Sequence, residues 1–110
     1  MVQKNILATI LINNYNNQKF IKQCINSCLS QSYKNLEIII YDDKSDDDSK
    51  KILLNIKNKK IKKIFNNKKK YKSSALNQFE AIRKSFSKSK GEIIFLLDGD
   101  DFFLKNKVKA

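Results

Sequence analysis

Four short apolar runs alternate along this chain with segments whose apolar residues recur at helical spacing. They lie at residues 6–12, 36–41, 61–65 and 92–97; the first is nearly continuously apolar, the second is β-branched, and the third, IKKIF, is a short strand with two lysines. Runs of this kind are typical of strands that are buried on both faces of a parallel sheet. Helical connections between successive strands favour parallel pairing with right-handed crossovers. The sequence therefore predicts an α/β fold with a Rossmann-like, doubly wound and mostly parallel sheet, in the order β-α-β-α-β-α-β.

The first helical segment, residues 18–30, carries Cys24 and Cys28 four residues apart on its apolar stripe. Free cysteine behaves as a small buried hydrophobe, so we expect both thiols to pack in the core rather than to form a redox pair. The chain has no histidine and no further cysteine. A zinc site would therefore lack ligands.

Two further helices are expected. Ser45 or Asp46 would cap the first of them, because the acidic stretch there suits the positive end of a helix dipole. The second helix covers residues 73–87, and its apolar stripe is expected to face the sheet. That stripe consists of Ala75, Leu76, Phe79, Ile82, Phe86 and the stem of Arg83.

The composition excludes several classes of protein. The only glycines are Gly91 and Gly99, so the glycine-rich phosphate loops of dinucleotide-binding enzymes and P-loop NTPases are absent. No apolar run approaches the roughly 20 residues that span a membrane. The N-terminus has no cleavage pattern of a signal peptide. We therefore expect a cytoplasmic protein, with the inner face of the membrane as a further place of action.

The formal charge of +12 comes almost entirely from lysine, much of it within residues 56–72. Such a surface fits the binding of nucleic acid, phospholipid or sugar phosphate, but it also fits a solvated face, which we favour. Nucleic-acid binding is not expected, because Arg83 is the only arginine and nucleic-acid readers prefer the bidentate fork of arginine. Residues 68–72 precede a helix start, where anions bind readily, so Lys70 or Lys72 is expected to meet a diphosphate.

Polar clusters follow three of the predicted strands, and ligands of parallel sheets bind at the carboxyl ends of strands. The clusters are Asn13 to Asn16, Asp42 with Asp43, and Asp98 to Asp101. Asp98 and Asp100 would point to the same side of an extended backbone. Because hard cations prefer oxygen ligands, this pair is expected to hold Mn²⁺ or Mg²⁺ and to join it to a diphosphate.

Five segments form a combination that is specific as a set. They are Tyr15-Asn16, S-x-L-S-Q-S-Y at residues 27–33, Glu37 at the start of the second strand, DD-x-S-D at 42–46, and GE-x-I-x-x-L-D-x-DD at 91–101. Together they resemble the family 2 nucleotide-sugar glycosyltransferases of the GT-A fold, over essentially the whole chain. The resemblance implies that residues 1–110 are the nucleotide-sugar-binding portion of a glycosyltransferase domain whose acceptor half is missing.

The resemblance also implies roles for individual residues. Asn13 and Tyr15 would line the nucleoside pocket, with Tyr15 near the base or ribose. Asp42 and Asp43 would contact the base, and Asp43 is favoured as the direct contact with uracil. Asp98 and Asp100 would bind the metal and the ribose-diphosphate, with Asp100 the more direct metal ligand. Lys72 would complete the donor-binding set, and Asp101 would support the site or cap the next element.

The sequence departs from the family pattern in three places. Lys44 stands where the family often has glycine, so it must adopt a conformation that lysine tolerates. Residues 66–78 lack the frequent Gly and the Ala-Arg-Asn run, of which Asn77 is the remnant. The general base of the family is expected beyond Ala110.

The resemblance implies an inverting, metal-dependent glycosyltransferase that acts on a nucleotide sugar, with UDP-sugar favoured. The acceptor would be a hydroxyl of a glycan or of a lipid-linked glycan in polysaccharide synthesis, and peripheral membrane contact is expected. By itself this chain is expected to bind the donor without transferring the sugar. The alternative is a non-catalytic α/β module that binds anionic polymer or membrane through its lysines.

Overall fold

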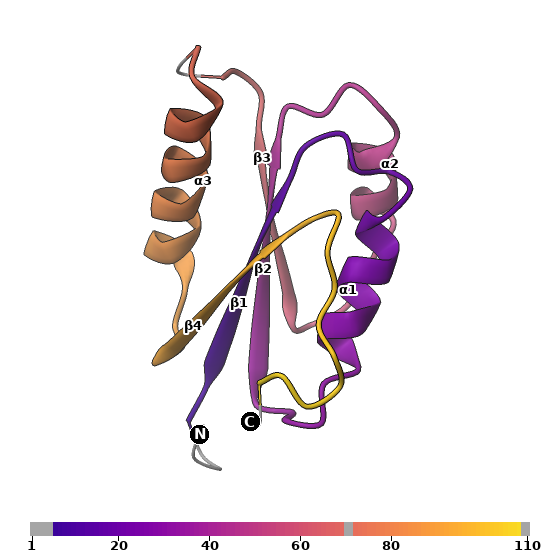
Figure 1. Ribbon diagram of the computed structural model, residues 1–110, viewed down its shortest axis with the longest axis vertical. Coiled ribbons are helices and arrows are strands. Elements are labelled where there is room, and N and C mark those ends of the chain that lie inside the picture. Colours follow the sequence, from indigo (N-terminus) through magenta and orange to yellow (C-terminus); the bar gives the residue numbers. More distant parts are fainter. Residues whose placement is uncertain (1–5, 70–71, 109–110) are drawn as a thin grey trace.

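The computed structural model describes residues 6–69 and 72–108, which form a sheet with helices on both faces (Figure 1). The strands are β1 (Ala8–Asn14), β2 (Leu36–Asp43), β3 (Ile61–Asn66) and β4 (Ile93–Asp98), and the helices are α1 (Ile21–Leu29), α2 (Ser49–Leu54) and α3 (Ser74–Lys88). All pairings are parallel, in the order β3-β2-β1-β4. Helices α1 and α2 cover one face and α3 covers the other. The predicted α/β order is confirmed.

The main core lies between the sheet and α1. Ile10 and Ile12 of β1 and Ile38 and Ile40 of β2 point into it and are fully buried, since alternate residues of a strand share a face. Cys24 and Cys28 meet them from α1 and are also fully buried free thiols, as predicted. A hydrogen bond with Cys28 and burial both raise the pKa of Cys24, so this thiol stays protonated and unreactive.

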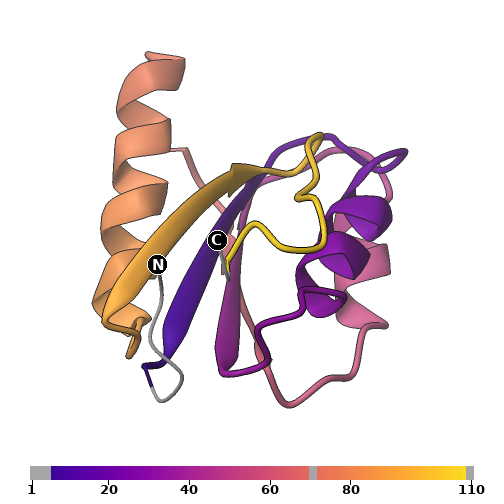
Figure 2. The same cartoon turned by 60° about the horizontal axis from the view of Figure 1, so that its bottom comes forward.

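Residues 99–108 return from the end of β4 across α1 (Figure 2). The side chain of Gln31, which is fully buried, holds this segment. Its Nε2 donates to the carbonyl oxygen of Leu104 at 2.8 Å, and its Oε1 accepts from the Val108 amide at 3.0 Å. The Phe103 amide donates to Ser27 Oγ at 3.0 Å. Ser27 and Gln31 of the S-x-L-S-Q-S-Y segment therefore fix the chain that follows the acidic cluster.

Glu37 links the strands at the opposite end of the sheet. Its buried carboxylate accepts hydrogen bonds from Thr9 Oγ1 at 2.6 Å, from the Gly91 amide at 3.2 Å and from the Lys90 amide, and it pairs with Lys62 Nζ at 3.2 Å. Burial opposes ionisation, but these donors outweigh it and hold the pKa of Glu37 below its usual value. A Cβ atom at Gly91 would lie 2.3 Å from Thr9 Oγ1, so this connection requires glycine.

The predicted orientation of the third helix was wrong. The face of α3 that packs on β1 and β2 consists of small or polar residues, among them Ala81 and Ser85, which allow close approach to the sheet. Phe79 and Phe86 lie on the opposite side and are 64% and 59% exposed. Of the expected stripe, only Ile82 is partly buried, whereas the following are exposed: Ala75, Leu76, Phe79, Arg83 and Phe86.

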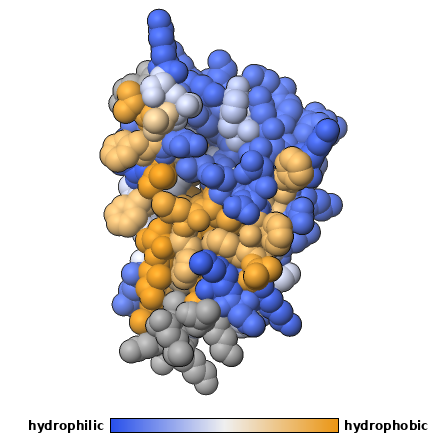
Figure 3. Space-filling model, in the orientation of Figure 1, coloured by the Kyte–Doolittle hydropathy of each residue, from blue (hydrophilic) through white to orange (hydrophobic). Residues whose placement is uncertain are grey.

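Helix α3 also leaves β4 partly uncovered. Leu96 pairs in register with Leu11 and lies on the same face of the sheet, yet it is 57% exposed because α3 packs over β1 and β2. Figure 3 shows apolar residues gathered on this side of the molecule, where α3 and β4 lie. None of the helices in the described residues has the length and apolar character that crossing a membrane requires.

The predicted cap of the second helix was also wrong. Helix α2 begins at Ser49 with Asp48 as its N-cap. Ser45 instead donates its hydroxyl to Asp42 Oδ1 at 2.6 Å, and the Asp46 amide donates to Asn16 Oδ1 at 2.7 Å. Both residues are thus held in a loop before the helix can start. Lys44 adopts a φ of 55°, a left-handed conformation that favours glycine.

Candidate functional site

A hollow of about 280 Å³ opens where β1, β2 and β4 end and α3 begins. Asn13 and Tyr15 line it from the end of β1, Asp43 from the end of β2, and Asp98 and Asp100 from the end of β4. The parallel register places Asn13 directly opposite Asp98. The structure therefore brings together five residues that the sequence indicated separately.

The backbone turns sharply between the two aspartates of the D-x-D pair. The Gly99 amide donates to the carbonyl oxygen of Asn13 at 2.8 Å, and the Asp101 amide donates to that of Asp98 at 3.0 Å. The backbone does not remain extended here, yet Asp98 and Asp100 line the same hollow. A Cβ atom at Gly99 would lie 2.5 Å from Asn14 Oδ1. Close packing against Asn14 therefore explains glycine here, since its φ is not positive.

Asp101 lies apart from this pair. It lines a neighbouring hollow of about 940 Å³, together with Leu96 and Phe102, and its Oδ1 accepts a hydrogen bond from the Phe102 amide at 2.8 Å. The two hollows share Asn13, Gln78 and Asp98 in their walls. Asp98 therefore stands at the boundary between the small polar hollow and a larger, more apolar one.

Asp42 and Asp43 differ sharply in their surroundings. Asp42 is 2% exposed, and its carboxylate accepts hydrogen bonds from Asn14 Nδ2 at 2.9 Å, Ser45 Oγ at 2.6 Å and the Ser45 amide at 3.2 Å. Asp43 is only partly buried, and Asn66 Nδ2 donates to its Oδ1 at 2.8 Å. Asp43 therefore keeps one carboxylate oxygen for a ligand, whereas Asp42 is engaged within the protein and does not line the hollow.

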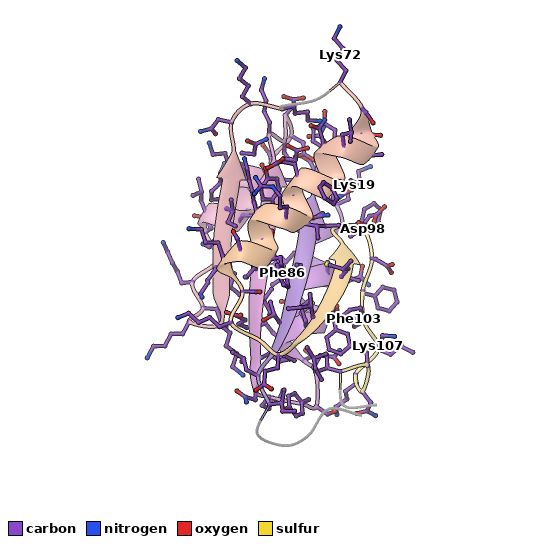
Figure 4. The ribbon with its side chains drawn as sticks, turned by 90° about the vertical axis from the view of Figure 1, so that its left-hand side faces the viewer. Lys19, Lys72, Phe86, Asp98, Phe103 and Lys107 are labelled. Atoms are coloured by element: carbon purple, nitrogen blue, oxygen red, sulfur yellow. The ribbon has the colours of Figure 1, made fainter. Side chains whose placement is uncertain are left out.

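The lysines near the hollow are arranged differently from the expectation. Lys72 is exposed and points away from the molecule at the N-terminal end of α3, whereas Asp98 lies beside the helix (Figure 4). Lys70 lies outside the described residues. Lys69, which the sequence did not single out, places its Nζ 3.3 Å from the centre of the Tyr15 ring. Among the described residues, Lys69 is thus the lysine in contact with the wall of the hollow.

Sequence reasoning overlooked four further residues of the wall: Asn17, Tyr41, Gln78 and Ala81. The signal for Tyr41 was available, because alternate residues of a strand share a face and Asp43 is two positions further on. Burial and the neighbouring charges of Asp43 and Glu80 raise the pKa of Tyr41, so it stays a neutral phenol. Asn77 also lines the hollow and is the remnant of the family pattern that the sequence did show.

The residues present fit a divalent cation that also binds a ligand. Within the described part of the chain, no lysine forms an ion pair with Asp98 or Asp100. No group of three or more His, Cys, Asp or Glu in the described residues could hold a metal alone. Mg²⁺ is usually bound through one or two carboxylates plus substrate phosphates, so Asp98 and Asp100 form a suitable donor set for a cation that arrives with a diphosphate.

The chain matches the model of the family described as "Glycosyl transferase family 2" over residues 9–110. An uncharacterized glycosyltransferase of Haemophilus influenzae is 36% identical over 107 residues, which cover 94% of this chain and 40% of the relative. The Escherichia coli UDP-Glc:alpha-D-GlcNAc-diphosphoundecaprenol beta-1,3-glucosyltransferase WfaP is 40% identical over 102 residues, which cover 93% of this chain and 38% of the relative. The chain thus spans about two fifths of the length of these relatives.

Solved structures show the same fold. TarS 1–349 of S. aureus superposes with a TM-score of 0.78 at 21% identity, covering 94% of this chain and 30% of that one. It has also been crystallised with UDP and with UDP-GlcNAc. A mannosyltransferase of Pyrobaculum calidifontis, in complex with GDP-Man and Mn²⁺, superposes with a TM-score of 0.70 at 18% identity, covering 87% of this chain and 28% of that one. The GT-A form of the α/β fold is confirmed.

Proposed function

Because this chain belongs to glycosyl transferase family 2, we propose that it is the donor-binding part of an enzyme that transfers a sugar from a nucleoside diphosphate to a hydroxyl acceptor. One observation carries the proposal. Asp98 and Asp100 share a single hollow with an aromatic ring, Tyr15, and a half-exposed carboxylate, Asp43. A metal-bound diphosphate and a nucleoside need these two kinds of group side by side.

We propose UDP as the nucleotide. The carboxylate of Asp43 is fixed through one oxygen by Asn66, and its other oxygen would accept a hydrogen bond from an N–H group of the base. Uracil carries such an N–H at its N3 position, whereas the corresponding nitrogen of cytosine has no hydrogen. Tyr15 would contribute apolar contact with the base or ribose, and Asn13 would line the nucleoside side of the hollow. Complexes of TarS with UDP and UDP-GlcNAc support this choice.

We propose that Asp98 and Asp100 hold Mn²⁺ or Mg²⁺, with Asp100 as the more direct ligand. The cation would neutralise charge on the departing nucleoside diphosphate. The Mn²⁺ complex of the Pyrobaculum mannosyltransferase supports a divalent metal. The turn at Gly99 sets the relative positions of the two carboxylates through its hydrogen bond to Asn13. The predicted contacts of Asp42 and Lys72 with the donor have less support, because Asp42 is engaged within the protein and Lys72 points into solvent.

The remaining features concern the whole enzyme. We propose an inverting transfer to a glycan or lipid-linked acceptor in polysaccharide synthesis, in the cytoplasm or at the inner face of the membrane. Such a transfer needs a general base that deprotonates the attacking hydroxyl. That base and the acceptor site would belong to the three fifths of the relatives that this chain does not cover. Residues 1–110 alone would bind the donor without turnover.

The proposal is tested by titrating UDP into the purified chain, with and without Mn²⁺, in a calorimeter. We expect binding that depends on the metal and that weakens by about tenfold or more in Asp100→Ala, since even outer-shell changes cost metal sites about 10- to 100-fold in affinity. Asp46→Ala, which removes an exposed carboxylate outside the hollow, is the matched control and should bind as the unaltered chain does. Absence of UDP binding, or indifference to both Mn²⁺ and Asp100, would contradict the proposal.

The formal charge of +12 favours a second candidate, a non-catalytic module that binds anionic polymer or membrane. Its expected signature is salt-sensitive binding to vesicles that contain an anionic lipid, unchanged in Asp100→Ala. The first candidate is preferred because the chain belongs to glycosyl transferase family 2 and because Asp43, Asp98 and Asp100 share one hollow.

A further inference from the structure

We propose that Lys69 occupies the base-binding space in the nucleotide-free protein and makes the site selective for phosphorylated ligands over nucleosides. This inference rests on the proposed function. Its starting point is the contact between Lys69 Nζ and the Tyr15 ring, at 3.3 Å from the ring centre. The Tyr15 side of the contact is accessible, since that residue is 44% exposed.

The strand order relates Lys69 to the residues of the hollow. Tyr15 follows β1 and Lys69 follows β3, and β2 lies between these two strands in the sheet. The loop after β3 and the Lys69 side chain together reach Tyr15 at the end of β1. Asp43 is the last residue of β2 and is the proposed contact for the base. The Lys69 ammonium thus covers the ring of Tyr15, which lines the same hollow as Asp43.

A base and the ammonium group cannot share the Tyr15 ring face that Lys69 covers. Carbon atoms in contact are about 3.5–4.0 Å apart, so an ammonium at 3.3 Å fills the layer that a stacked base needs. A base that stacks on this ring face must therefore displace Lys69, whether or not its nucleoside is phosphorylated. When only a fraction of the protein is in the conformation that can bind a ligand, the apparent affinity for that ligand is reduced by this fraction.

Only an anionic ligand can replace the contact that Lys69 loses when it leaves the Tyr15 ring. Among the described residues, no hydrogen bond or ion pair involves the Lys69 ammonium, so its contact with Tyr15 is the interaction that binding removes. A nucleoside carries no negative charge that could pair with the displaced ammonium group. A nucleoside diphosphate brings negative charge within reach of a flexible lysine and restores a favourable partner. Lys69 therefore opposes the binding of all bases and favours the binding of anionic ligands.

The test compares uridine and UDP as ligands of the unaltered chain, Lys69→Ala and Lys68→Ala. Lys68 is an exposed neighbour, so its substitution changes the net charge equally without touching Tyr15. In Lys69→Ala, we expect uridine to bind about two- to fivefold more tightly, the range that corresponds to an exposed cation–π contact. UDP in the presence of Mn²⁺ should bind about threefold or more weakly, as one nearby charge is lost. Lys68→Ala should neither strengthen uridine binding nor weaken UDP binding to this extent.

A second measurement does not depend on ligand affinity. In the ligand-free protein, the side-chain methylene protons nearest the Lys69 ammonium should show an upfield ring-current shift in NMR spectra, which disappears in Tyr15→Leu. Lys68 should show no such shift. The inference is overturned if Lys69 shows no ring-current shift, or if the ratio of UDP to uridine affinity is the same in Lys69→Ala and Lys68→Ala. Failure of the proposed function looks different, because UDP would then not bind the unaltered chain while the ring-current shift persisted.

Discussion

Asp42 and Asp43 are adjacent in sequence but have different surroundings, because successive residues of a strand point to opposite faces of the sheet. The carboxylate of Asp42 accepts three hydrogen bonds from Asn14 and Ser45 and joins the loops that follow β1 and β2. Within the described residues, the carboxylate of Asp43 accepts a hydrogen bond from Asn66 alone, and Asp43 lines the hollow. Asp42 therefore stabilises the loops around the site, whereas Asp43 is available to a ligand.

Asp42→Ala should therefore lower the free energy of unfolding by about 2 kcal/mol or more, since it leaves the buried donors of Asn14 and Ser45 without an acceptor. Asp43→Ala should change that free energy by less than about 1 kcal/mol and should abolish detectable UDP binding. Urea unfolding followed by circular dichroism, together with calorimetric titration, separates the two effects. A larger loss of stability in Asp43→Ala than in Asp42→Ala would contradict this division.

At the level of elements, α3 has two faces with different partners. The face that meets the sheet is small and polar, and the apolar face carries Phe79 and Phe86 away from it. Periodicity identified the helix and its apolar stripe, but it could not show which side meets the sheet. The size of Ala81 and Ser85 decided this, because small residues allow the helix to lie close to β1 and β2.

This orientation predicts an unusual pattern of substitution effects. Phe79→Ser and Phe86→Ser should change the free energy of unfolding by less than about 0.5 kcal/mol beyond helix propensity, since both rings are exposed. Ala81→Leu should lower it by about 1–3 kcal/mol through overpacking against the sheet. Thermal and urea unfolding of the three variants would check this. The reverse order of effects would restore the orientation expected from the sequence.

For the whole molecule, Glu37 couples stability to pH. Its pKa is lower in the folded chain than the ordinary value of 4.5, so its contribution is fully present above about pH 4.5 and is lost as the pH falls through the lower folded pKa. We expect the unfolding midpoint in urea to fall steeply below pH 4.5, and Glu37→Gln to flatten this acid limb while lowering stability at pH 7. An acid limb of equal steepness in Glu37→Gln would assign the effect to other carboxylates.

Much of this architecture was open to prediction because it depends on local patterns. Short apolar runs separated by helical segments predicted four parallel strands, and the rule that ligands bind at the carboxyl ends of strands predicted that Asn13, Asp43 and Asp98 would meet. The burial of Asp42 depends on its hydrogen bond with Asn14 and on the loop that follows Asp42. Only the pairing of β1 with β2 in the folded chain brings Asn14 and Asp42 together. The contact of Lys69 with Tyr15 joins residues 54 positions apart, and no spacing rule indicates it.

The position of β1 in the centre of the sheet affects how the chain is made. One edge of β1 pairs with β2 soon after both leave the ribosome, but its other edge must wait for β4, which begins about 85 residues later. At about 5–20 residues per second, the delay is roughly 4–17 s. For the later part of that time Thr9 and Glu37 have both been synthesised, whereas the amides of Lys90 and Gly91 that complete their hydrogen bonds do not yet exist. The nascent chain therefore carries an apolar strand with one unpaired edge for seconds, and we expect chaperones that act during translation to bind it in this interval.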